Sequence, residues 1–150
     1  LETAKVLAQR EDMEVKLLPQ LRERHYGLFQ GITAEQGAKL YPAAYAHYLA
    51  RDLDYDFETG ESLRIFAQRV EDAIDWLVRH HSGQTIAAVS HSGVLDVVYR
   101  RATGRPLSTP RDFVIPNCAL NWFHFDSHGW HLESWADRHH LHEVLTEPPE

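Results

Sequence analysis

The stretch Thr85–Gly104, TIAAVSHSGVLDVVYRRATG, decides the fold. Its first half contains an apolar run, Ile86–Val89, that is typical of a short buried strand. Its second half has apolar residues at helical spacing and ends at a glycine, a residue typical of helix ends. Four small or polar residues, Ser90-His91-Ser92-Gly93, join the two halves. A strand, a tight turn and a helix form half of a βαβ unit, so we predict a buried strand with His91 at its carboxyl end.

The start of the helix predicted after His91 is suited to an anion. The first N–H groups of a helix have no partner within it, and the helix dipole favours negative charge there. Open α/β sheets also bind their ligands at the carboxyl ends of strands. His91 would add a titratable donor at this position. Many α/β domains have such turns without a function, so both interpretations stay open at this point.

Composition bounds the class of protein. A chain of 150 residues is expected to form one domain that buries roughly 70% of its unfolded surface. A formal charge of −7 argues against a nucleic acid or an anionic membrane as partner, and no apolar run approaches the length of a membrane span. The single cysteine, Cys118, excludes an internal disulfide and favours a reducing compartment, so we expect a cytoplasmic protein.

Periodicity and caps predict the remaining elements. Thr33 and Gln36 form a capping box, Pro42 suits the first turn of a helix, and Ser62–His81 has one apolar stripe. We predict a three-layer α/β/α sandwich with a mostly parallel sheet and a late hairpin. The further helices cover Leu1–Gln9, Thr33–Leu40, a segment from Pro42 to about Leu49 and Ser62–His81, and the further strands cover Val15–Leu18, Ala119–Phe125 and Trp130–Trp135.

The stretch Leu21–Gly31, LRERHYGLFQG, has neither the period of a strand nor that of a helix. Such a polar stretch is either a solvated loop or a site. We favour a site, because Glu23 stands between Arg22 and Arg24, which places one carboxylate beside two guanidinium groups that suit phosphate.

The acidic run from Asp52 to Glu61 has the alternating acids of a calcium loop. However, Phe57 stands where the turn glycine belongs, and Leu63 stands where the bidentate glutamate belongs. We therefore predict a solvated loop without a metal.

Serine hydrolysis is one mechanism that the sequence leaves open. Ala88-Val89-Ser90-His91-Ser92 follows the small-x-Ser-x-small pattern of a nucleophile elbow, and Asp137 and His140 follow in a workable order. The true motif prefers glycine at both small positions, which weakens the match.

A metal site is a second alternative. Its ligands would be histidines of the last third of the chain, although no H-E-x-x-H motif is present. The two candidate groups are His124, His128 and His131, or His139, His140 and His142.

Phosphoryl transfer, with Glu23 as proton donor and His91 as an anion-holding group, is the third alternative and the one we favour. Leu21–Gly27, LRERHYG, resembles the (N/R)-E-R-H-Y-G segment of the histidine phosphatase superfamily, the phosphoglycerate-mutase-like enzymes. Gly60–Leu63 is similar to the family's G-E-S helix start, and Val89–Val94 is similar to its V-(S/A)-H-G-G-V turn. The motifs occur in the family's order over essentially the whole chain.

The resemblance implies a mechanism and a site. In such enzymes a histidine of an R-H-G segment attacks the phosphoryl group and forms a phosphohistidine. Glu23 matches the glutamate that protonates the leaving oxygen, and His91 matches the second catalytic histidine. Arg24 and the backbone N–H of Ser92 are expected to bind the phosphate. The substrate is expected to be a small phosphorylated metabolite, handled by a phosphatase or a mutase without metal or cofactor.

The sequence departs from the family in one respect, because the 150 residues contain no R-H-G triplet. We expect residues 1–150 to be a single, N-terminally incomplete domain whose nucleophile lies outside them, and we expect no meaningful turnover from these residues alone. An unpaired strand edge would then favour a homodimer or another strand-mediated association. The alternative is a catalytically inactive phosphate-binding domain of the same fold.

Overall fold

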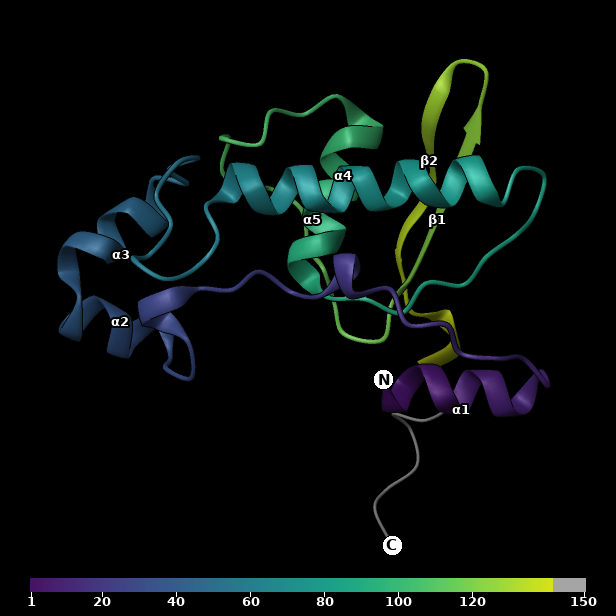
Figure 1. Cartoon of the computed structure of the whole chain (residues 1–150), viewed down its shortest axis with the longest axis horizontal. Helices are drawn as coiled ribbons and strands as arrows, with labels where there is room; N and C mark the ends of the chain where they lie inside the picture. Colours follow the sequence, from purple (N-terminus) through teal and green to yellow (C-terminus); the bar gives the residue numbers. More distant parts are fainter. Residues whose placement is uncertain (142–150) are drawn as a thin grey trace, which may run out of the picture.

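The computed structural model describes residues 1–141 of the chain (Figure 1). Helices dominate it, and a β-hairpin follows them late in the chain. Helices α4 and α5 lie next to each other, and α5 also packs on the hairpin. The α-helices are α1 (Glu2–Arg10), α2 (Ala34–Leu40), α3 (Pro42–Leu49), α4 (Leu63–His80) and α5 (Ser92–Thr103), the strands are β1 (Leu120–Asp126) and β2 (Gly129–Asp137), and short 3₁₀ turns are η1 (Pro19–Leu21), η2 (Gly27–Phe29) and η3 (His139–Leu141).

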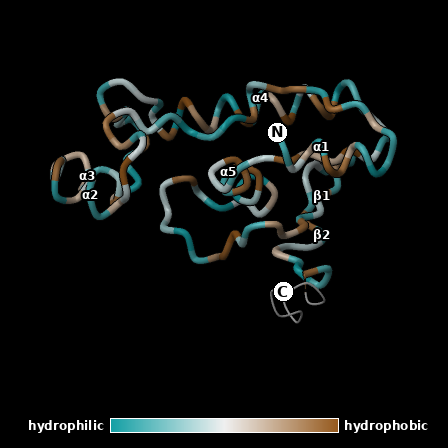
Figure 2. The backbone as a smooth tube through the Cα atoms, turned by 90° about the horizontal axis from the view of Figure 1, so that it is seen from below, coloured by the Kyte–Doolittle hydropathy of each residue, from teal (hydrophilic) through white to brown (hydrophobic). Residues whose placement is uncertain are grey.

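The core lies between α4 and α5. The apolar stripe predicted along Ser62–His81 is confirmed, since Phe66 and Val70 are almost completely buried and pack against Val94 and Val97 of α5. Each such side chain stabilises the fold by roughly 1.5–3 kcal/mol relative to an exposed position. Hydrophobic residues recur between hydrophilic ones along α4, as expected for an amphipathic helix (Figure 2).

The predicted helix ends are also confirmed. Thr33 and Gln36 form the capping box of α2, and Pro42 occupies the first turn of α3. The hydroxyl of Ser62 accepts the N–H of Ile65 at the start of α4. Gly104 ends α5 with φ 67°, a left-handed conformation that glycine adopts without steric cost.

The sheet differs from the prediction. The hairpin is confirmed, because β1 and β2 pair antiparallel with Asp126 opposite Gly129 at the turn. These two strands form the one sheet of residues 1–141, so the mostly parallel sheet is not seen there. Val15–Leu18 and Ile86–Val89 have no strand structure, and the buried strand predicted for the latter is wrong: Ile86 is 45% exposed and Val89 is 44% exposed. An apolar run is buried as a strand only where neighbours pair with it and cover it, and neither segment has such a neighbour in the described chain.

The loop between α3 and α4 is solvated only in part. Asp54 is exposed and forms an ion pair with Arg64, as expected for a solvated loop. Phe57, in contrast, is 2% exposed and packs against Tyr26 and Phe29. The alternating acids therefore indicated solvent exposure correctly for Asp54 and Asp56 but not the burial of Phe57 between them and α4. None of the helices in the described part of the chain is long and apolar enough to cross a membrane.

Candidate active site

Glu61 fixes the backbone of the segment that carries Glu23. The backbone N–H of Glu61 donates to the carbonyl of His25 over 2.8 Å, and its carboxylate accepts the N–H of His25 over 3.0 Å. The carbonyl of Glu61 accepts Nε of Arg24 over 2.9 Å. These bonds hold an irregular segment against the start of α4, where Ser62 caps the helix.

Arg69, on the second turn of α4, completes this support. Its Nε and Nη2 bind the two carboxylate oxygens of Glu61 over 2.8 and 2.7 Å, which is the bidentate geometry of a strong ion pair. Its Nη1 donates to the carbonyls of Gln20 and Arg22 over 2.6 and 3.1 Å. One guanidinium group therefore ties the backbone on the N-terminal side of Glu23 to α4.

Glu61 is consequently held in its ionised form. Burial alone would raise the pKa of this carboxyl, but the hydrogen bonds from Arg69 and the His25 N–H, together with the charges of Arg69 and Arg22, outweigh burial and lower the pKa below its ordinary value. Glu61 was assigned to the solvated acidic loop from the sequence, and this assignment is wrong. Its side chain is 12% exposed and is a central support of the site.

The carboxylate of Glu23 lies against the start of α5. Oε1 accepts the N–H of Arg24 over 2.8 Å. Oε2 accepts the N–H of Gly93 over 3.0 Å and lies 3.5 Å from the hydroxyl of Ser92. The first N–H groups of a helix lack partners within the helix, and here a carboxylate supplies one. The structure thus brings together Glu23 and the turn around His91, which are nearly seventy residues apart in sequence.

His91 is the N-cap residue of α5 and is exposed. It lies two residues after Val89, at the end of the Ile86–Val89 segment where the sequence places it, although that segment is not a strand. Its carbonyl accepts the N–H of Leu95, which closes the first turn of the helix. Ser92, the first residue of α5, is exposed beside it. Glu23, His91 and Ser92 therefore form one candidate site at the N-terminus of α5.

Arg24, which the sequence predicts to bind the phosphate, is largely buried in the structure. It is 8% exposed, and its Nε and Nη2 donate to the carbonyls of Glu61 and Tyr55. The guanidinium carbon lies 5.2 Å from the ring centre of Tyr26 and 5.1 Å from that of Phe57, within cation–π distance. Burial lowers the pKa of Arg24 from its ordinary value. In this structure Arg24 holds the backbone around Tyr55 and Glu61 in place, and a contact with phosphate stays a prediction.

The serine-hydrolase alternative has no support in this geometry. A nucleophilic serine donates its hydroxyl proton to a base. The hydroxyl of Ser90 donates instead to the backbone carbonyl of Leu21 over 3.0 Å, and Asp137 binds the ring of His139. This bond explains why a serine follows the apolar run, because it ties the turn to η1.

The metal alternative has no support either. Among residues 1–141, no group of three or more His, Cys, Asp or Glu side chains is arranged to hold a metal ion. Of the histidines considered from the sequence, His142 lies outside the described residues.

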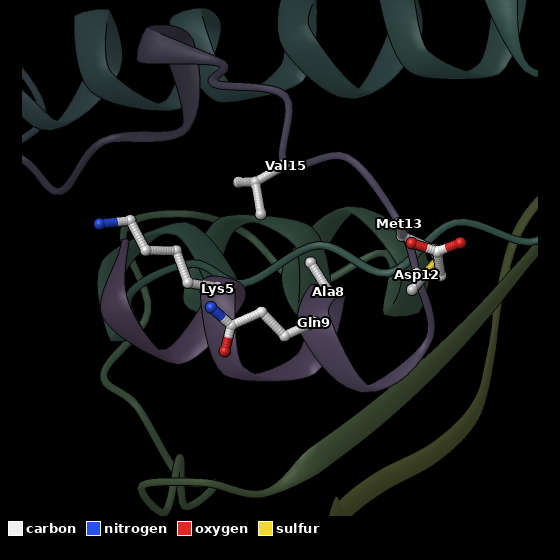
Figure 3. A pocket seen from close by; sticks show the side chains of 6 residues that line it. All are labelled: Lys5, Ala8, Gln9, Asp12, Met13 and Val15. Carbon is white, nitrogen blue, oxygen red and sulfur yellow. The ribbon is translucent and has the colours of Figure 1, made fainter.

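Residues 1–141 form at least two concave regions, one of which adjoins the candidate site. A shallow pocket of about 350 Å³ lies beside α1, lined by side chains such as Lys5, Gln9 and Asp12 (Figure 3). The second, of about 300 Å³, is bounded by Gly93 and by arginines that sequence reasoning missed. No local pattern indicates these arginines, because Arg51 and Arg111 reach Asp96 from other segments of the chain.

Comparison with solved structures establishes the fold class. YhfR from Bacillus stearothermophilus is 24% identical and superposes with a TM-score of 0.83, over 93% of this chain and 70% of that one. This likeness confirms the phosphoglycerate-mutase-like α/β fold expected from the motifs.

Sequence comparison establishes the family. The pattern of the Histidine phosphatase superfamily (branch 1) matches residues 1–138, so the chain belongs to this superfamily. A metal-independent phosphoserine phosphatase of Arabidopsis thaliana is 33% identical over 87% of the chain and 54% of its own length. The phosphoglycerate mutase-like protein 4 of the same plant is 34% identical over 95% of the chain and 62% of its own length. The chain thus spans little more than half the length of these relatives.

Proposed function

We propose that this chain is the larger part of a phosphomonoester phosphatase that works through a phosphohistidine intermediate. The observation that carries the proposal is the Glu23 carboxylate, held by Gly93 at the start of α5 beside the exposed His91. A proton donor and an imidazole ring next to helix N–H groups are what a phosphoryl group needs. The name of the Arabidopsis phosphoserine phosphatase supports hydrolysis of a small phosphorylated metabolite.

In the first step a histidine nitrogen attacks phosphorus, and the bond between phosphorus and the leaving oxygen breaks. Glu23 gives its proton to that oxygen, so the product leaves as a neutral hydroxyl group. In the second step Glu23 takes a proton from water, the water oxygen attacks phosphorus, and the phosphorus–nitrogen bond breaks. His91 and the Ser92 N–H stabilise the charge on the phosphoryl oxygens in both steps.

The nucleophile in this proposal lies outside residues 1–150, which contain no R-H-G triplet. His91 is not given that role, because its place as the cap of α5 suits a group that holds the phosphoryl oxygens. The single cysteine is consistent with a cytoplasmic location, which is also a proposal.

The decisive experiment uses a polypeptide that joins residues 1–150 to the coding sequence upstream of them. We expect it to hydrolyse a generic phosphomonoester in the presence of a chelator and to form an acid-labile, alkali-stable phosphoenzyme. Glu23→Gln should slow turnover by at least ~10²-fold, because general acid–base catalysis contributes about 10²–10⁴-fold. Lys39→Gln, an exposed change on α2, is the matched control and should have no effect.

The outcomes separate the alternatives. Turnover that a chelator abolishes would contradict the metal-independent mechanism. Phosphate binding without turnover or phosphoenzyme would favour the inactive phosphate-binding domain. Full turnover by residues 1–150 alone, lost in His91→Ala, would show that His91 is the nucleophile.

A further inference from the structure

The cavity of about 300 Å³ beside Glu23 has a wall that the phosphoryl chemistry leaves unused. Gly93 and Asp96, three residues apart on one face of α5, both line it. The N–H of Gly93 holds Glu23, so the cavity begins directly next to the proposed proton donor. A group bound there belongs to the part of the substrate beyond the leaving oxygen.

Asp96 is a buried carboxylate that binds three arginines. It is 3% exposed. Nη2 of Arg51 donates to it over 2.8 Å, Nε of Arg111 over 3.0 Å, and Nε of Arg100 over 3.2 Å. Burial alone would raise the pKa of Asp96, but the charges and hydrogen bonds of the arginines outweigh burial and lower it. The carboxylate is therefore ionised, and its group of four side chains has a net charge of +2.

This positive charge comes with unused hydrogen-bond donors. Arg111 uses only Nε, so its Nη1 and Nη2 have no hydrogen-bond partner among residues 1–141, and its side chain is 37% exposed. Nε of Arg51 donates to the carbonyl of Leu107 and its Nη2 donates to Asp96. Nη1 of Arg51 has no hydrogen-bond partner in the same part of the chain. An anion in the cavity would satisfy the free Nη groups of Arg111 and Arg51, because both residues line it.

The other acidic group of the cavity does not cancel this charge. Asp52 binds the ring of His47 over 2.7 Å and accepts the N–H groups of Asp54 and Tyr55. Asp52 adds one negative charge, but Arg24, which also lines the cavity, adds one positive charge, so the net charge of +2 is unchanged.

We propose that this cavity binds a carboxylate on the leaving group of the phosphomonoester, with Arg111 as the main specificity residue. Arg51 adds a second donor, and Asp96 positions both arginines. The inference rests on the proposed phosphatase function, because it takes the phosphate to lie at Glu23 and His91. Two free Nη groups on one planar guanidinium match the two oxygens of a carboxylate.

The test measures binding by titration calorimetry on the 150-residue chain, so it does not depend on turnover. The probes are O-phosphoserine, O-phosphoethanolamine, which lacks only the carboxylate, and inorganic phosphate. We expect phosphoserine to bind at least ~10-fold more tightly than phosphoethanolamine, as expected for one charge-assisted bidentate contact. Arg111→Gln should remove this difference and leave the affinity for inorganic phosphate unchanged. Arg111→Lys, which keeps the charge but not the fork, should retain part of it.

Arg79→Gln is the matched control, because it removes one exposed arginine at the other end of α4 from the cavity. It should leave all three affinities unchanged, and circular dichroism should confirm that every variant is folded. Equal affinity of the wild-type chain for the two esters would overturn the inference, as would absence of binding. An equal loss of phosphate affinity in Arg111→Gln would assign Arg111 to the phosphate and also overturn it. A chain that prefers the carboxylate without any turnover would sustain the inference while the phosphatase proposal fails.

Discussion

The N–H of Gly93 donates to Oε2 of Glu23 over 3.0 Å, and a Cβ atom on Gly93 would lie 2.2 Å from Oε1 of the same carboxylate. The carboxylate therefore occupies the space that any side chain at position 93 would need. The close approach of Glu23, and not the backbone conformation, requires glycine at this position, because the φ of Gly93 is not positive. This contact joins an irregular segment to the first turn of α5 and sets where the proposed proton donor lies.

Gly93→Ala should therefore lower the catalytic rate and leave the free energy of unfolding almost unchanged. The added methyl group displaces the far end of a flexible side chain, so the free energy of unfolding should change little. The catalytically complete polypeptide should lose at least ~10²-fold in kcat, because Glu23 leaves its position. The measurements are steady-state kinetics and urea unfolding.

Gly83→Ala is the control for this prediction. Gly83 has φ +72°, and a Cβ there would meet no atom within 4 Å. It should lose about 1 kcal/mol of stability from backbone strain and keep its kcat. A Gly93→Ala enzyme with normal kcat would show that Glu23 does not act from this position.

Arg69→Lys tests the support behind Glu23. A lysine ammonium cannot form the two parallel bonds to Glu61 and also bind the carbonyls of Gln20 and Arg22. We expect a loss of about 1–3 kcal/mol in the free energy of unfolding, measured with urea. Arg101→Lys, at a half-exposed pair with Asp75, should lose less than 1 kcal/mol. Equal losses in the two variants would contradict a special role for Arg69.

The pKa of Glu61 predicts how stability depends on pH. Its pKa in the folded chain is lower than its ordinary value of 4.5, so below that value the unfolded chain binds protons more readily. The stabilisation is therefore complete above about pH 4.5 and is lost as the pH falls through the folded pKa. The pKa of Asp96 is also lowered, from its ordinary value of 3.8, so Asp96 likewise contributes stability that is lost on acidification.

Glu61→Gln is the variant that checks this. It should be less stable than the parent chain at pH 7, and the difference should shrink on acidification, as measured by urea unfolding at a series of pH values. Glu35→Gln, at an exposed pair with Lys39, should parallel the parent chain. A difference that grows on acidification would contradict the predicted lowering of the Glu61 pKa in the folded chain.

Local chemistry explains what the sequence predicted well. The capping box at Thr33, the serine cap at Ser62 and the stop at Gly104 depend on residues within one helical turn, and all three are confirmed. The stripe of α4 was predictable for the same reason, because its period lies in the sequence itself.

The failures all involve distant partners. Ile86–Val89 has the composition of a strand, but pairing depends on neighbours elsewhere in the chain. Glu61 was predicted to be solvated because its partners His25 and Arg22 lie more than thirty residues earlier in the chain. The cluster around Asp96 was missed because Arg51 and Arg111 come from two separate loops. The candidate site was therefore predictable as motifs, while the cavity beside it was not.

The unpaired Ile86–Val89 segment leads to the last prediction, which concerns association. Ile86 and Val89 are 45% and 44% exposed, and no strand in the described residues pairs with the backbone of this segment. An exposed apolar edge pairs readily with another chain, and a lysine on such an edge opposes pairing. Residues 1–150 should therefore self-associate with rising concentration in sedimentation velocity, and Ile86→Lys should weaken this association. Val6→Lys, at a 67% exposed position on α1, is the control and should leave it unchanged. A chain that stays monomeric at every concentration, or that responds to Val6→Lys but not to Ile86→Lys, would contradict association through this edge.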